Sequence, residues 1–145
     1  MSFILVVAST KGGVGKSTTA INLAVEWMVR NHAVILVDAD PQTTALRWAS
    51  EAAERGVKAP SVVGAQDNIR QAIPPLASNA DVTIIDTAGR LSGRLVSAMT
   101  IADLVIVPCR PNPADIWALA DTVETIKRVQ ELRPDLPAHL LINGY

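Results

Sequence analysis

The chain has few of the residues that hold a protein together without a large core. Cys109 is its only cysteine among 145 residues, which excludes an internal disulfide and a cysteine-rich zinc site. Aromatic residues make up only 3% of the sequence, although 49% of it is hydrophobic. The core must therefore be built from Val, Ile, Leu and Ala, a composition typical of α/β proteins with buried parallel strands.

Strong net charge and long apolar runs are also absent. The formal net charge of −1 gives no overall attraction to nucleic acid or acidic membranes, so contact with DNA would need a local basic patch. No apolar run approaches the ~20 residues that span a bilayer, and Met1-Ser2 leads directly into an apolar run without the charged start of a signal peptide. We expect a cytoplasmic protein with a single domain over residues 1–145.

The stretch at residues 9–18, Ser-Thr-Lys-Gly-Gly-Val-Gly-Lys-Ser-Thr, is the most informative in the chain. The apolar run at residues 3–8 predicts a buried strand before it, and the apolar spacing over residues 17–30 predicts a helix after it. Strand, glycine-rich loop and helix are the context of a phosphate-binding loop.

The residue types of this loop suit an anion. Backbone N–H groups can converge on one phosphate where no Cβ is in the way, which the sequence allows at Gly12, Gly13 and Gly15. Lys16 adds a full positive charge, and the Ser17 hydroxyl, at the N-terminus of the predicted helix, is placed to bind Mg²⁺. The sequence therefore predicts a triphosphate site.

The loop differs from the usual Gly-x-x-x-x-Gly-Lys-Ser/Thr pattern, because Thr10 stands at the first glycine position and Lys11 follows it. In this it resembles the deviant Walker A loop of the ParA/MinD ATPases. The resemblance implies that Lys11 reaches the nucleotide of a partner subunit. It also implies that ATP contacts Gly12, Gly13, Val14, Gly15, Lys16, Ser17 and Thr18.

Two aspartates follow the second apolar run, residues 33–37. Ligands in open α/β sheets bind at the carboxyl ends of strands, so Asp38 and Asp40 are expected near the loop. The segment Asp-x-Asp-Pro-Gln resembles switch I of plasmid-partition ATPases, which assigns water positioning to Asp40 and support of Mg²⁺ to Asp38. A structural alternative makes Asp40 a helix N-cap, with Pro41 as the first helical residue.

The third apolar strand ends in Asp86, followed by Thr-Ala-Gly89. A strand ending in aspartate fits Walker B, where the carboxylate holds Mg²⁺, and the glycine allows the backbone to approach a γ-phosphate. The segment resembles switch II of the same family. Arg90 or Arg94 is a candidate for stabilising charge in the transition state, with a solvated arginine as the alternative.

The remaining pattern predicts further helices and strands. Helices are expected over residues 42–55, over 67–72 up to Pro74-Pro75, from residue 90 with Leu91, Leu95 and Met99 inward, and over 114–132 with one stripe of Ile116, Leu119, Ala120, Val123, Ile126 and Val129. Strands are expected at 104–107 and 138–142. The resemblance assigns an adenine contact to Asn143, whose alternative role is a turn before Gly144.

Together these features predict a three-layer α/β/α P-loop NTPase domain with a mostly parallel sheet and helices on both faces. The resemblance implies a Mg²⁺-dependent ATPase that forms an ATP-dependent homodimer in plasmid or chromosome partition. It also implies a ParB-like stimulating partner and a nucleoid location through non-specific DNA binding. The alternatives are a MinD-like or cargo-positioning ATPase and a nucleotide-binding carrier with little hydrolysis. Because family members usually continue past the equivalent of Tyr145, a C-terminal truncation is expected.

Overall fold

A six-stranded sheet forms the centre of the computed structural model, which describes residues 1–65 and 67–144. Its strands are β1 (Phe3–Val7), β2 (Val34–Ala39), β3 (Ser61–Gly64), β4 (Val82–Thr87), β5 (Leu104–Cys109) and β6 (Ala138–Ile142). Every pairing is parallel, in the order β3-β2-β4-β1-β5-β6. The sequence-based prediction of a mostly parallel sheet is confirmed.

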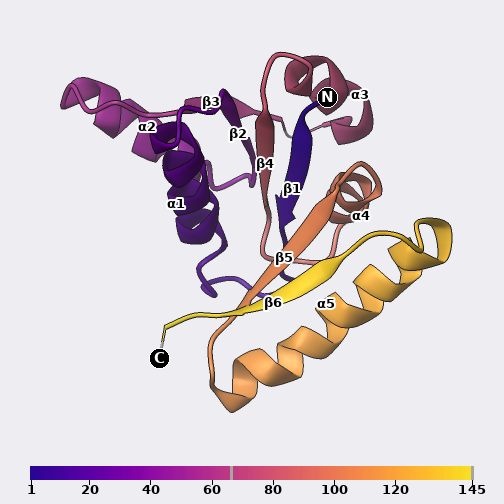
Figure 1. The fold of residues 1–145 in the computed structure, drawn as a ribbon. Coiled ribbons are helices and arrows are strands. Elements are labelled where there is room, and N and C mark those ends of the chain that lie inside the picture. Colours follow the sequence, from indigo (N-terminus) through magenta and orange to yellow (C-terminus); the bar gives the residue numbers. More distant parts are fainter. Residues whose placement is uncertain (66, 145) are drawn as a thin grey trace.

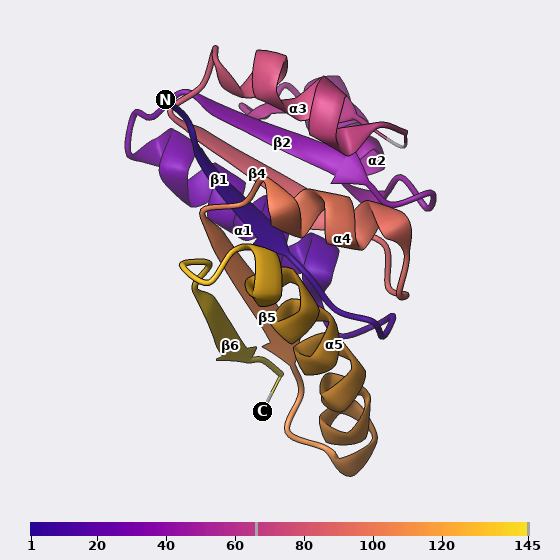
Figure 2. The ribbon, with the colours of Figure 1, turned by 90° about the vertical axis from the view of Figure 1, so that its right-hand side faces the viewer.

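Helices cover both faces of this sheet (Figures 1 and 2). They are α1 (Lys16–Val29), α2 (Thr44–Glu54), α3 (Ile69–Ala77), α4 (Gly93–Thr100) and α5 (Pro113–Leu132). One apolar cluster joins α1 and α2 to one face, and a second joins α3, α4 and α5 to the other. The predicted three-layer α/β/α architecture is confirmed.

The pairing of β4 with both β1 and β2 determines where the charged residues lie. Asp38 on β2 is the register partner of Asp86 on β4, and Asp86 is also opposite Val7, the last residue of β1. Since the loop that follows β1 begins immediately after Val7, the two aspartates and the glycine-rich loop lie at the same edge of the sheet.

The prediction that Pro74-Pro75 ends the third helix is wrong, because both prolines lie inside α3. A proline inside a helix removes a backbone hydrogen bond and costs about 3 kcal/mol. Here the helix persists because Ile69, Ile73 and Ala77, four residues apart, are all buried against the sheet. Tertiary burial outweighs the local preference.

Two predicted helix faces also need correction. Leu91 lies before α4 and is 56% exposed, while Leu95 and Met99 are buried as expected. On α5, Ile116, Ala120 and Val123 are exposed, and the buried residues are Asp115, Thr122, Thr125, Ile126 and Val129. The apolar spacing missed this face because three of its five residues are polar.

The outer surface of α5 and the edge strand β6 carry exposed apolar side chains. Trp117 is 75% exposed, and Leu140, Leu141 and Ile142 of β6 are exposed as well. Among the residues that the structure describes, no helix is both long and apolar enough to cross a membrane.

Candidate functional site

The loop between β1 and α1 turns sharply into the helix at Gly15. Gly15 is the residue before α1 and has a φ of 93°, in the left-handed region that favours glycine. Its carbonyl accepts the backbone N–H of Thr19 at 2.9 Å, so it begins the helix. Gly13 also has a positive φ, but Gly12 does not. A Cβ on Gly12 would meet nothing within 4 Å among the described residues, so neither its backbone conformation nor crowding requires a glycine there.

An open cavity of about 610 Å³ lies over this loop. Its lining residues are Gly12, Gly13, Gly15, Lys16, Ser17, Thr18, Asp40, Pro41, Gln42, Thr44, Ala88, Gly89 and Arg90. The fold thus brings most of the predicted site residues together around one space. Lys11, Val14, Asp38, Asp86 and Asn143 do not line it, and each is placed separately below.

Lys16 forms the base of the loop. Its side chain is largely buried, and Nζ donates a hydrogen bond to the Lys11 carbonyl at 2.9 Å. Burial lowers the pKa of Lys16, whereas the charges of Asp86 and Asp40 partly oppose that shift. A desolvated ammonium group beside backbone N–H groups suits an anionic ligand better than a solvated one, because less water must be displaced.

Asp86 is fully buried at the end of β4, and among the described residues neither of its carboxylate oxygens has a hydrogen-bond partner. Burial raises the pKa of Asp86 to about 6, against the opposing effects of Ser17 and Lys16, and nearby Asp38 and Asp40 add to the rise. A buried carboxylate without a partner is costly for the fold. These two oxygens fit a hard cation held beside Ser17.

Asp38 supports the backbone of the following turn. Its Oδ1 accepts from the Asp40 N–H at 3.1 Å and its Oδ2 from the Leu46 N–H at 3.0 Å. Both oxygens of this buried carboxylate thus hold the segment that carries Asp40. Within the described residues, no cluster of three or more His, Cys, Asp or Glu could hold a metal ion.

Asp40 faces the cavity from a tight turn, and the alternative that makes it a helix N-cap is wrong. Helix α2 begins four residues later, at Thr44, with Thr43 as its N-cap residue, and Pro41 lies in the turn. Asp40 Oδ1 accepts the Gln42 N–H at 2.9 Å, a local bond typical of aspartate in turns. This fixes the carboxylate at the cavity wall.

Asn143 lies against the loop. Its side-chain amide donates to the carbonyl of Val14 at 3.3 Å, and a Cβ on Gly15 would come within 2.4 Å of its Nδ2. In this structure the amide therefore holds the loop from the end of β6.

Gly89 packs against the loop so closely that no side chain fits. A Cβ there would lie 2.7 Å from Gly12 Cα and 3.0 Å from Lys16 Nζ. We expect Gly89→Ala to displace the loop and weaken nucleotide binding at least ~10-fold, as measured by calorimetry, since displacing two binding groups costs upward of ~1.4 kcal/mol. Gly93→Ala is the matched control, because a Cβ there meets nothing within 4 Å. Equal affinities for the two variants would contradict the role of this contact.

Two arginines, Arg90 and Arg94, lie beside the site. Arg94 pairs with exposed Asp67 at 3.1 Å, and Arg90 lines both the main cavity and a neighbouring one.

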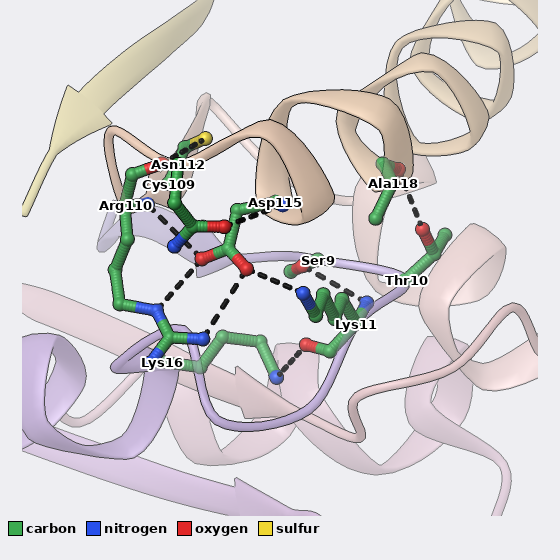
Figure 3. Close-up of polar contacts among 9 residues, drawn as sticks. All are labelled: Ser9, Thr10, Lys11, Lys16, Cys109, Arg110, Asn112, Asp115 and Ala118. Atoms are coloured by element: carbon green, nitrogen blue, oxygen red, sulfur yellow. Dashed lines mark hydrogen bonds and ion pairs between the residues drawn. The ribbon is translucent and has the colours of Figure 1, made fainter.

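Sequence reasoning missed a polar group on α5 that contacts the loop. Asp115 accepts hydrogen bonds from Lys11 and Arg110, and Thr122 binds Thr10 (Figure 3 shows the Asp115 part). The available signal was Asn112-Pro113, which predicts the start of a helix and so places Asp115 in its first turn. Indeed, the Asn112 side chain accepts the Asp115 N–H at 3.0 Å.

A parallel α/β sheet with a glycine-rich loop between β1 and α1, and with a buried aspartate at the end of the neighbouring strand, defines a P-loop nucleotide-binding domain. Comparison with known proteins identifies the family of P-loop domains to which it belongs. Residues 5–145 match the model of the CobQ/CobB/MinD/ParA nucleotide binding domain, and the chain belongs to that family.

Relatives with different roles share this domain. The chain is 31% identical to "Maintenance of carboxysome distribution protein A" of Halothiobacillus neapolitanus, covering 98% of this chain and 66% of that protein. It is 32% identical to "Protein ParA" of Rhizobium radiobacter, over 96% of this chain and 63% of the relative. The chain thus spans less than two thirds of the length of these relatives.

Among solved structures, cobyrinic acid a,c-diamide synthase from Mycobacterium smegmatis, with bound ADP and magnesium, has a TM-score of 0.84. The two chains are 24% identical, and the match covers 100% of this chain and 75% of the other. This similarity establishes the fold.

Proposed function

We propose that the chain is a Mg²⁺-dependent ATPase that acts as a nucleotide-gated dimerisation switch in plasmid or chromosome partition. The observation that carries the proposal is the convergence of Lys16, Asp40 and Gly89 on one cavity, together with the buried carboxylate of Asp86 near the end of β4, which has no hydrogen-bond partner among the described residues. In this arrangement Lys16 can bind phosphate, the oxygens of Asp86 can hold a metal ion, and the carboxylate of Asp40 can orient a water molecule.

The loop would bind the triphosphate through its backbone N–H groups, with Lys16 supplying the positive charge and Thr18 lying at the start of α1. When bound, Mg²⁺ neutralises charge on the phosphate oxygens. Ser17 and Asp86 would hold it, and Asp38 would act by orienting the segment of Asp40. Asn143, at the loop, would also contact the adenine base.

Asp40 would orient the attacking water. Its carboxylate lies at the wall of the cavity, and its Oδ1 is fixed by the Gln42 N–H. Gly89, which also lines the cavity, would respond to the presence or absence of the γ-phosphate, because it lies directly against Gly12 and the Lys16 ammonium group of the loop.

Lys11 would act in the dimer, by reaching the nucleotide of the partner subunit. We expect Lys11→Ala to bind ATP but to remain monomeric, because the variant lacks the charge that bridges the two sites. Sedimentation with a non-hydrolysable ATP analogue and Mg²⁺ measures this, and the parent chain is expected to dimerise. Lys58→Ala, at an exposed position, is the control. A Lys11→Ala variant that dimerises like the parent would exclude this role.

Two relatives indicate two kinds of cargo. A relative named for carboxysome distribution favours cargo positioning as a second candidate, and the relative named ParA favours partition. In either case we propose a ParB-like partner that stimulates hydrolysis, non-specific DNA binding and a cytoplasmic, nucleoid-associated location. Stimulation of the ATPase by a purified partner encoded beside the gene would identify the cargo.

A further inference from the structure

The first residues of the glycine-rich loop are bound to α5. The Thr10 N–H donates to Thr122 Oγ1 at 3.1 Å, and the two hydroxyl oxygens lie 3.0 Å apart. The Thr10 hydroxyl also donates to the Ala118 carbonyl at 3.3 Å. These bonds hold the backbone next to Lys11 against α5.

The Lys11 side chain turns toward α5 of its own chain. Its Nζ donates to Asp115 Oδ1 at 2.5 Å, and the Asp115 side chain is fully buried (Figure 3). Lys11 itself is only 31% exposed. The ammonium group is therefore held within its own chain.

Asp115 has a second cationic partner. Arg110 Nε donates to Oδ2 at 2.7 Å, Arg110 Nη2 donates to Oδ1 at 3.2 Å, and the Arg110 backbone N–H donates to Oδ2 at 3.3 Å. The hydrogen bonds from Arg110, and then from Lys11, hold the pKa of Asp115 well below its usual range. The carboxylate is thus a buried anion shared by two cations, one of which binds it through both oxygens.

A buried charge that loses its only partner strongly destabilises a protein. Lys11 can leave Asp115 without that penalty, because the two-point contact from Arg110 remains. Arg110 is 42% exposed on its side chain, so it can remain in place and stay hydrated on its outer side.

We propose that Asp115 is a positioning residue for Lys11 and that Arg110 is the partner that permits its release. Asp115 holds Lys11 within its own subunit when no nucleotide is bound, and the Asp115–Arg110 pair persists when Lys11 moves to the partner's nucleotide. The proposal rests on the proposed function, in which Lys11 acts across a nucleotide-bound dimer.

Two substitutions should then have opposite effects. Asp115→Asn removes the anion that retains Lys11, so nucleotide-dependent dimerisation should tighten by about tenfold. Arg110→Gln leaves Lys11 as the only cation on Asp115, so dimerisation should weaken by about tenfold. A merely structural role for this cluster would make both variants change the dimer in the same direction.

The test on the 145-residue chain uses two measurements. The first is the dimer dissociation constant by sedimentation, with a non-hydrolysable ATP analogue and Mg²⁺. The second is the rate at which a small amine-reactive reagent labels Lys11 without nucleotide, followed by mass spectrometry relative to exposed Lys58. The labelling rate should rise about fivefold in Asp115→Asn and fall in Arg110→Gln.

Glu124→Gln is the matched control, because Glu124 is an exposed carboxylate of α5 that pairs with Arg128. It should change neither measurement. If Asp115→Asn does not fold, Arg110→Gln alone must weaken the dimer and protect Lys11.

The outcomes separate the two proposals. Unchanged labelling and unchanged dimerisation in both variants, with a parent that dimerises normally, would overturn this inference and leave the proposed function intact. A parent that binds nucleotide but never dimerises would overturn the proposed function and this inference with it.

Discussion

Replacing Asp86 by Asn is expected to make the nucleotide-free protein more stable and to abolish its Mg²⁺-dependent ATPase activity. Asp86 is buried without a partner among the described residues, and burial raises its pKa from 3.8 to about 6. At neutral pH the folded protein therefore carries an unfavourable charge. A shift of this size corresponds to about 3 kcal/mol, of which an uncharged but still buried amide should recover about 2 kcal/mol.

The direction of the pH dependence follows from the same pKa shift. Because the pKa is higher in the folded than in the unfolded chain, the folded state binds more protons between about pH 4 and 6. The contribution of Asp86 is thus most favourable below the unfolded pKa and is lost as the pH rises through about 6. Burial is the largest cause of the raised pKa of Asp86; Ser17 and Lys16 oppose it, and Asp38 and Asp40 add to it.

Urea unfolding of the parent and of Asp86→Asn at several pH values measures this difference. The gain in the variant should be largest above pH 6.5 and small at pH 4.5, and added Mg²⁺ with nucleotide should stabilise the parent only. Asp121→Asn, at an exposed position of α5, controls for the loss of one negative charge. A variant that is less stable than the parent at pH 7.5 would show that Asp86 has a favourable partner.

Replacing Lys16 by Ala is expected to reduce ATP affinity roughly 100-fold. Lys16 is largely buried at the base of the loop, and within the part of the chain that the structure describes its Nζ donates only to the Lys11 carbonyl. Hydrogen bonds from a charged donor contribute about 1.5–3 kcal/mol, and the upper end applies where the cation is already desolvated.

Calorimetric titration with an ATP analogue and Mg²⁺ measures this affinity, and a thermal melt verifies that the variant is folded. Lys58→Ala, on the exposed surface, is the matched lysine control. An unchanged dissociation constant in a folded Lys16→Ala variant would mean that the phosphates bind elsewhere.

The sequence allowed the sheet, the loop and the edge of the sheet that carries the site to be predicted, because each rests on local patterns. Apolar runs ending in Asp38 and Asp86, and the run before Gly12, predict parallel strands whose carboxyl ends meet. These features depend on residues close together in the chain.

What could not be predicted depends on contacts between distant residues. Pro74 and Pro75 remain helical because of burial against the sheet, which no local pattern reports. Likewise, Lys11 and Asp115 are 104 residues apart in the sequence, and Thr10 and Thr122 are 112 residues apart, yet both pairs are in contact. A polar face on α5 gives no apolar periodicity, so its role became visible only in three dimensions.

Trp117 provides an optical probe of the binding of a subunit or partner to α5. Its indole is 75% exposed on α5, two residues beyond Asp115, while Trp27 and Trp48 are each partly buried. Indole fluorescence shifts to shorter wavelength when water is excluded. Any subunit or partner that covers the start of α5 would thus change the emission of the unlabelled protein, so that assembly could be followed in real time.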